Sequence, residues 1–298
     1  MTEARIVSSS RDRVGESPLW SPDEQALYWV DIEGRCIHRL DHRTGIQQSW
    51  PTPQRVGCIA RVTGGGLLAA METEIHHLAL HAPPALRSRL VARIVHPRPN
   101  MRFNDGRCDH QGRLWVGTMS MDGTPAGPVG AWYRLDERGL SAPLIDGQYT
   151  PNGSAFSPDG RVFYRSDSHP SVQRIWAHDY DTGQGLPGPA RTFIERLPAP
   201  GRPDGAAVDA DGCYWICAND AGRVLRYSPQ GQLLAGLEVP VPKPAMCAFG
   251  GPQLDRLFVT SIQPAGAPEG PHGAVFELSP GVCGLPEPCF SRFPAASS

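Results

Sequence analysis

The sequence lacks several features that identify large classes of protein. It has no run of about 18 apolar residues, which argues against a membrane-spanning helix. Residues 1–13 are polar and have no apolar core of the kind found in secretory signals. The 28 basic residues include a single lysine, Lys243, and form no basic stripe for nucleic acid. These absences predict a soluble cytoplasmic protein with neither membrane nor nucleic-acid partners.

Signatures of common hydrolases and nucleotide-binding proteins are also missing. There is no GxSxG nucleophile elbow and no P-loop. One GxGxxG match, Gly183-Gln-Gly185-Leu-Pro-Gly188, contains proline and opens no helical pattern, so it does not predict a dinucleotide site. The eight cysteines are scattered over 298 residues and do not resemble a disulfide framework.

What the sequence does contain is a repeat of about 45 residues. Each copy has a turn, a β-rich run, a gap and a second β-rich run, and the turns begin at residues 21, 64, 109, 157, 209 and 250. A period near 45 with several strands per unit is typical of a propeller. We therefore predict an all-β fold, a six-bladed β-propeller with four-stranded antiparallel blades, in which residues 1–298 form a single domain.

The same pattern predicts finer features of this propeller. Residues 85–95, which come closest to a helical pattern, fall where the second copy needs its outer strand. A strand near Ile6 and a C-terminal strand near Phe290 are expected to pair in one blade and close the ring, which removes exposed sheet edges. The Gly/Pro-rich gaps at 120–130 and 263–273 are expected to form loops on one face, where specificity usually resides.

In four copies a carboxylate or carboxamide stands five residues ahead of the turn. These residues are Glu16, Asn104, Asn152 and Asp204. The other two copies carry Ile59 and Ala245 at this offset. Five residues upstream of the turn is the start of the innermost strand, whose alternating side chains face the central channel. The offset predicts that the four polar side chains meet at one end of that channel.

Two carboxylates and two carboxamides, without Cys or His, form an oxygen-only set that suits a hard divalent cation. Calcium is the expected ion, with Mg²⁺, Mn²⁺, Zn²⁺ or Fe²⁺ as alternatives. Asn and Asp before glycine are also routine turn formers, but the shared offset favours a common site. Arg102 shares the strand face of Asn104, and its planar fork suits a carboxylate or sugar hydroxyls. Arg202 holds the equivalent place before Asp204, where a substrate contact and a salt bridge are alternatives.

These motifs resemble the senescence marker protein/regucalcin–gluconolactonase family. The matching stretches run from about residue 15 to 278: Gly15-Glu-Ser-Pro-Leu-Trp20, Arg102-Phe-Asn-Asp-Gly106, Gly112-Arg-Leu-Trp-Val-Gly-Thr-Met119, Pro151-Asn-Gly153, Phe156-Ser-Pro-Asp-Gly160, Pro203-Asp-Gly205, Phe249-Gly-Gly251 and Leu257-Phe-Val-Thr260. The resemblance implies a six-bladed propeller with one divalent metal in its channel.

On the matching positions, the resemblance makes Glu16, Asn152 and Asp204 metal ligands, with Asp204 also the general base. It makes Arg102 and Asn104 contacts for a sugar-like substrate, so Asn104 moves from ligand to substrate contact. Two segments depart from the family pattern. Ser120-Met121-Asp122 replaces an acidic substrate contact of some members, and Ala218-Asn-Asp-Ala-Gly222 replaces a Trp-rich stretch of many bacterial ones.

The predicted function is a metal-dependent lactonase that hydrolyses a sugar (aldono) lactone, or a similar small hydroxylated lactone, to the free acid. The metal polarises the carbonyl and Asp204 takes the proton of the attacking water. A phosphotriesterase-like hydrolase and a non-catalytic calcium-binding or interaction propeller are the alternatives, because propellers host many functions. The expected partner is the small lactone, and the expected state is a monomer or a small homo-oligomer.

Overall fold

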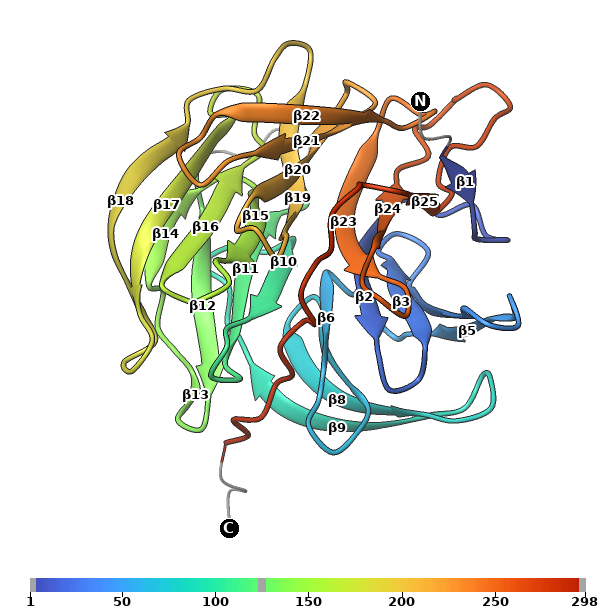
Figure 1. Ribbon diagram of the computed structural model, residues 1–298. Coiled ribbons are helices and arrows are strands. Elements are labelled where there is room, and N and C mark those ends of the chain that lie inside the picture. The colour runs from blue at the N-terminus through green and yellow to red at the C-terminus, as the bar shows by residue number, and fades with distance from the viewer. Residues whose placement is uncertain (1–3, 123–126, 295–298) are drawn as a thin grey trace.

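A computed structural model of the protein describes residues 4–122 and 127–294. Its strands form six sheets arranged around a common axis (Figure 1). No helix long and apolar enough to cross a membrane occurs within the described ranges. The predicted six-bladed all-β propeller is confirmed.

The first three blades, in chain order, consist of the following strands. Blade 1 contains β2 (Gly15–Ser21), β3 (Ala26–Asp31), β4 (Cys36–Asp41) and β5 (Gln47–Pro51). Blade 2 contains β6 (Cys58–Arg61), β7 (Leu67–Ala70), β8 (Glu74–Leu80) and β9 (Leu86–Arg93). Blade 3 contains β10 (Met101–Cys108), β11 (Leu114–Ser120), β12 (Gly130–Asp136), β13 (Gly139–Leu140) and β14 (Ile145–Gln148). In blade 3 both β13 and β14 pair with β12, so its outer strand is divided in two.

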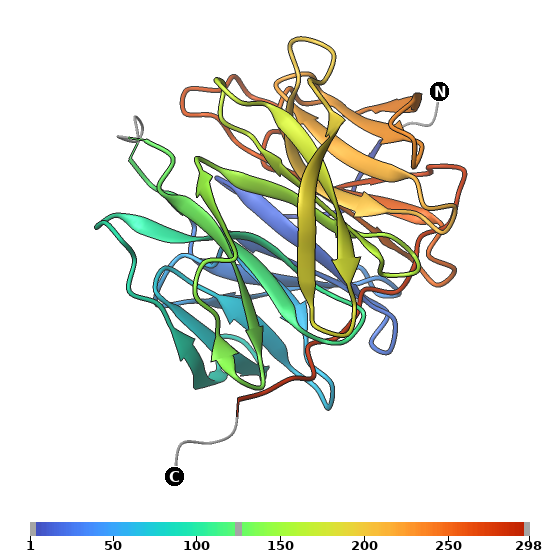
Figure 2. The ribbon, with the colours of Figure 1, turned by 90° about the vertical axis from the view of Figure 1, so that its left-hand side faces the viewer.

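The remaining three blades complete the ring. Blade 4 contains β15 (Pro151–Phe156), β16 (Val162–Asp167), β17 (Arg174–Asp181) and β18 (Leu186–Ile194). Blade 5 contains β19 (Arg202–Val208), β20 (Tyr214–Asn219), β21 (Arg223–Tyr227) and β22 (Leu233–Glu238). Blade 6 contains β23 (Pro244–Gly250), β24 (Arg256–Ser261), β25 (Phe276–Leu278) and β1 (Arg5–Ile6). Figure 2 shows the twist of the strands, with blade 4 (yellow-green) turned toward the viewer.

The finer predictions have mixed outcomes. Residues 86–93 form the outer strand β9 rather than a helix, as expected. The ring closes where N-terminal β1 pairs with β25 in blade 6, so closure by N- and C-terminal strands is confirmed. The prediction that the strand near Phe290 takes part in this closure is wrong, because Phe290 forms an isolated bridge with Val62 instead. Its buried ring packs among the apolar side chains of blades 2 and 3, which hold it away from blade 6.

The core lies between neighbouring blades, because each blade is apolar on both faces. Between blades 6 and 1, for example, the side chains of Trp20, Leu27, Trp29, Phe258 and Val275 form one buried cluster. Alternating residues of a strand point to opposite faces, so both faces of a central strand must be apolar to be covered by two neighbours. This explains continuous apolar runs such as those in β3 and β20.

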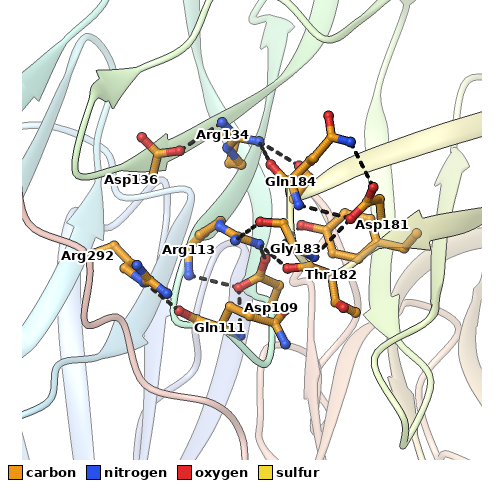
Figure 3. Close-up of polar contacts among 12 residues, drawn as sticks. Asp109, Gln111, Arg113, Arg134, Asp136, Asp181, Thr182, Gly183, Gln184 and Arg292 are labelled. Atoms are coloured by element: carbon orange, nitrogen blue, oxygen red, sulfur yellow. Dashed lines mark hydrogen bonds and ion pairs between the residues drawn. The ribbon is translucent and has the colours of Figure 1, made fainter.

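Buried polar groups at the turns also bind neighbouring blades together. Asp109 accepts hydrogen bonds from the Arg113 backbone N–H and guanidinium at 2.9 Å each. Arg113 and Arg134 of blade 3 reach the turn at 181–185 in blade 4 and donate to four of its carbonyls at 2.7–3.0 Å (Figure 3). These two arginines of blade 3 therefore hold the turn of blade 4 in position.

A buried ion pair holds the segment that joins blade 6 to blade 1. Asp12 Oδ1 lies 3.2 Å from His38 Nε2, and its other oxygen accepts a hydrogen bond from Trp29 Nε1 at 2.8 Å. The Asp12 N–H donates to Gly273 O of blade 6 at 2.8 Å. Burial alone lowers the pKa of His38, but the hydrogen bonds to Asp12 and Cys36 and the negative charge of Asp12 together outweigh it, and the pKa is about 9.

This pair predicts a loss of stability in mild alkali. Because the folded pKa of His38 is raised above its ordinary value near 6.5, its contribution is complete below that value and is lost as pH rises through about 9. The free energy of unfolding should fall by about 3 kcal/mol across this window. Denaturant titrations between pH 6 and 10 measure it. The Asp12→Asn variant should show a flatter profile, and an equal decline in both proteins would contradict the assignment.

Candidate functional site

The candidate site lies where the inner strands begin at one end of the channel. The inner strands β2, β6, β10, β15, β19 and β23 contact one another around the ring. In five of them the pairing register shifts at or directly beside the offset residue, whereas β6 continues regularly. A β-bulge re-aims the side chain next to it, and this local irregularity turns the offset residues toward the axis.

Backbone conformation at two of these bulges is unusual. Gly153, directly after Asn152, has φ of 65°, and a Cβ there would lie 2.6 Å from the Ser166 and Tyr214 oxygens. Ser17, directly after Glu16, has φ of 49° although it carries a side chain. Left-handed backbone is costly for residues other than glycine, so both positions are shaped to place the preceding side chain.

The structure brings four of the five predicted site residues into one chain of hydrogen bonds. Arg102 Nη1 donates to Asn104 Oδ1 at 2.5 Å, and Asn104 Nδ2 donates to Asn152 Oδ1 at 2.7 Å. Asn152 Nδ2 in turn donates to Asp204 Oδ1 at 2.7 Å. All four side chains are buried, and buried amide groups need hydrogen-bond partners. Each amide here finds its partners in the neighbouring side chains around the channel.

Within the described part of the chain, Glu16, the fifth predicted residue, makes no direct hydrogen bond to the other four. Its link to them is electrostatic, since the charges of Asp204 and Arg102 shift its pKa. Its carboxylate accepts a 3.2 Å hydrogen bond from the Ser17 N–H. Burial raises the pKa of Glu16 well above its ordinary value, and the negative charges of Asp204 and Asp105 raise it further. Arg102 opposes this rise. Glu16 therefore faces a channel in which two other carboxylates lie close by.

Asp204 is held on both oxygens and has a strongly shifted pKa. Asn152 donates to Oδ1, and Asn219 Nδ2 donates to Oδ2 at 2.8 Å. Burial raises the pKa of Asp204 to about 7, while the Asn219 hydrogen bond and the charge of Arg202 oppose the rise. A carboxylate with a pKa near neutrality is suited to accept and return a proton at physiological pH.

Sequence reasoning missed three residues of this site. Asn219, at the end of β20, faces Asp204 because Arg202 and Asn219 are paired across β19 and β20. Ser168 accepts a hydrogen bond from Asn152 and donates to Pro203 O, each at 2.6 Å. Asp105 is buried with Oδ1 lacking a partner among the described residues. Only Asp105 had a sequence signal, as a carboxylate directly beside Asn104 in the Arg102–Gly106 motif.

Arg202 forms a salt bridge in this structure. Its guanidinium lies 2.5 Å from Asp220, which also pairs with Lys243. Arg202 and Lys243 both lie near Asn219 Oδ1, at 3.4 and 3.5 Å, and therefore turn the Asn219 nitrogen toward Asp204. Of the two alternatives for Arg202, the salt bridge is formed, and the substrate contact stays a prediction.

A pocket of about 460 Å³ opens at this end of the channel. Its lining includes Glu33, Arg102, Met121, Asp122, Tyr149 and Arg202. The predicted loop at 120–130 contributes Ser120, Met121 and Asp122 to the wall, and its residues 123–126 lie outside the described part of the chain. The loop at 263–273 begins where Gln263 N donates to Arg13 O at 3.1 Å, beside the start of β2. Both loops therefore lie at the face that carries the site.

The donor set fits an oxygen-preferring cation. Within the described residues no cluster of three or more His, Cys, Asp or Glu side chains is arranged around a metal position. The site instead combines the carboxylates of Glu16 and Asp204 with the amide of Asn152. In this structure Asn152 turns its nitrogen toward Asp204, and a half turn of the amide would present its oxygen there. Carboxylate and amide oxygens are ligands that Ca²⁺ and Mg²⁺ accept.

Comparisons with known proteins agree with this geometry. A family model described as SMP-30/Gluconolactonase/LRE-like region matches residues 14–263. The 6-deoxy-6-sulfogluconolactonase of Pseudomonas putida is 37% identical over 283 residues, covering 93% of this chain and 95% of that protein. Pentonolactonase XacC of Haloferax volcanii is 37% identical over 299 residues, covering 96% and 97%. The crystal structure of the calcium-binding protein regucalcin from Agrobacterium tumefaciens has a TM-score of 0.87 and 29% identity, covering 97% of both chains.

The crowded carboxylates predict that the chelated protein loses stability as pH rises toward neutrality. Because the folded pKa of Asp204 is raised to about 7, its contribution is complete below the ordinary value near 3.8 and is lost as pH rises through about 7. In EDTA, the free energy of unfolding should fall by roughly 2–4 kcal/mol between pH 4.5 and 8. Denaturant titrations measure this slope. Glu16→Gln should make it shallower, whereas the exposed Asp146→Asn should not, and identical slopes in all three proteins would exclude this origin.

Proposed function

Because the chain belongs to the SMP-30/gluconolactonase/LRE-like family, we propose that it is a metal-dependent lactonase that opens a sugar lactone, or a similar small hydroxylated lactone, to the free acid. The relatives support the general class of activity, since the Pseudomonas and Haloferax proteins are named as lactonases. The chain is accordingly a lactone hydrolase, and the metal, the base and the substrate contacts are the parts proposed here.

The observation that carries the proposal is the position of Asp204. It lies at the end of the hydrogen-bonded chain Arg102–Asn104–Asn152, in the channel where a pocket of about 460 Å³ opens over Arg102. A single carboxylate there can receive a proton while its second oxygen stays fixed by Asn219. This combination of a buried base and a polar pocket large enough for a small sugar lactone is what lactone hydrolysis requires.

The residues proposed to hold a divalent cation are Glu16, Asn152 and Asp204. When bound, the ion would polarise the lactone carbonyl and stabilise the oxyanion that develops on it. Calcium is the proposed ion because the ligands are all oxygen, and Mg²⁺, Mn²⁺, Zn²⁺ and Fe²⁺ are alternatives. The resemblance to a calcium-binding protein supports this choice.

The chain's own groups then account for proton transfer and positioning. Asp204 accepts a proton from the water that attacks the carbonyl carbon. It returns this proton to the ring oxygen when the bond between the carbonyl carbon and the ring oxygen breaks. Water adds across the ester bond and no covalent intermediate with the protein forms. Arg102 and Asn104 would hold the hydroxyl groups of the sugar ring, since the Arg102 fork has donors beyond those bound to Asn104 and Phe103.

Removing the proposed base should stop the reaction. Asp204→Asn keeps the shape of the side chain but cannot accept the proton, so kcat should fall by at least about a hundredfold. The thermal midpoint in EDTA and the circular dichroism spectrum show whether the fold is retained. Asp146→Asn, at an exposed position, is the matched control and should keep full activity. Full activity in Asp204→Asn would remove Asp204 from the mechanism.

Metal dependence is tested by removing and restoring the ion. Chelated enzyme should release protons from sugar lactones no faster than the uncatalysed reaction in a pH-indicator assay. Restoring Ca²⁺, Mg²⁺, Mn²⁺, Zn²⁺ or Fe²⁺ one at a time should recover turnover, and the best ion identifies the cofactor. An organophosphate panel run in parallel tests the phosphotriesterase-like alternative. Stabilisation by an ion without turnover of any substrate would instead indicate a non-catalytic calcium-binding protein.

A further inference from the structure

The C-terminal segment after β25 crosses the end of the channel opposite to the candidate site. We call residues 283–292 the strap; Figure 1 shows this dark red segment running through the middle of the ring between β23 and β6. Cys283 and Gly284 form backbone hydrogen bonds to blades 5 and 6 at 2.9 and 2.8 Å. Phe290 bonds to blade 2 at 2.7 and 2.9 Å, and Ser291 bonds to blade 3 at 3.0 Å. The strap is therefore anchored to four blades on both sides of the axis.

Arg107 lies inside the channel between the strap and the site. Its Nε donates to Ser154 O at 2.9 Å, and its Nη2 donates to Ala206 O at 2.6 Å. Ser154 is two residues after Asn152 on β15, and Ala206 is two residues after Asp204 on β19. One guanidinium on β10 therefore holds the two strands that carry the proposed base and one of its ligands.

Glu287 of the strap supplies a counterion for this arginine. It forms an ion pair with Arg107 Nη1, and the two side chains are 15% and 9% exposed. The cavities beside the pair measure about 40 and about 10 Å³, which is room for a few waters at most. The negative charge of Asp105 also favours the charged guanidinium. Loss of one of the two carboxylates near a buried guanidinium is destabilising, so the strap contributes to keeping Arg107 in place.

The arrangement matters because no backbone ladder joins the inner strands. β10, β15 and β19 belong to three different sheets, so the spacing between Asn104, Asn152 and Asp204 depends on side chains. Asp105 accepts a hydrogen bond from the Ser154 N–H at 2.8 Å, on the same residue whose carbonyl Arg107 binds. We propose that Arg107 is a positioning residue for the site, and that Glu287 of the strap maintains it from the far end of the channel.

The test compares Glu287→Gln with Arg292→Gln. Glu287→Gln removes the counterion without changing shape. Arg292 is also in the strap but donates to Gln111 O at a turn outside the channel, so its loss is a control for strap stability. Hydrogen exchange of metal-free protein should show reduced protection in β15 and β19 for Glu287→Gln alone. This arm requires neither a metal nor a substrate.

The second arm rests on the proposed lactonase function. Glu287→Gln and Arg107→Lys should lower kcat by about tenfold while KM changes less than about twofold, since displaced catalytic groups affect the reaction more than binding. Arg292→Gln should keep the kcat of the wild type even if its melting temperature falls as much as that of Glu287→Gln. Unchanged exchange in β15 and β19, or equal losses of kcat in Glu287→Gln and Arg292→Gln, would overturn the proposal. An inactive wild type would refute the lactonase, and hydrogen exchange would still decide the role of Glu287.

Discussion

Closure of the ring is the constraint on which the other features of the molecule depend. Each blade is apolar on both faces, so no blade can bury its surface without a neighbour on each side. The N-terminal β1 completes blade 6 by pairing with β25, which ties the two ends of the chain together in the ring. The Asp12–His38 pair holds the connection that follows β1. Once the ring is closed, six inner strands must begin around one axis, and their first side chains must share a narrow channel.

That crowding explains why the site is polar and tightly linked. Asn104, Asn152 and Asp204 are buried without backbone ladders between their strands, so their amide and carboxyl groups satisfy one another. The carboxylates of Glu16 and Asp204 remain without a full counterion, and the pKa of each is raised chiefly by burial. A site of this kind stores an unfavourable electrostatic energy that a divalent cation would relieve. The groups whose pKa values are raised here are the ones proposed for metal binding and catalysis.

Much of the fold and part of the site could be predicted because both follow from local, repeated signals. The turns and β-rich runs recur in every blade, and the fixed offset identified Glu16, Asn104, Asn152 and Asp204 from spacing alone. Asn219 and Ser168 could not be found in this way, since they reach Asp204 and Asn152 across neighbouring strands. The strap was misassigned because Phe290 is a lone aromatic residue without strand periodicity, and its burial against blade 2 depends on the assembled ring.

We propose that Glu16, Asn152 and Asp204 form one oxygen-only metal site at the start of the inner strands. The most direct measurement is a crystal structure of the protein soaked with Mn²⁺ and recorded at the metal absorption edge, with a second crystal in Ca²⁺. We expect one anomalous peak in the channel, from an ion bound by oxygen atoms of these three side chains and displaced by Ca²⁺. A peak elsewhere, or a channel without metal in crystals of active enzyme, would contradict it.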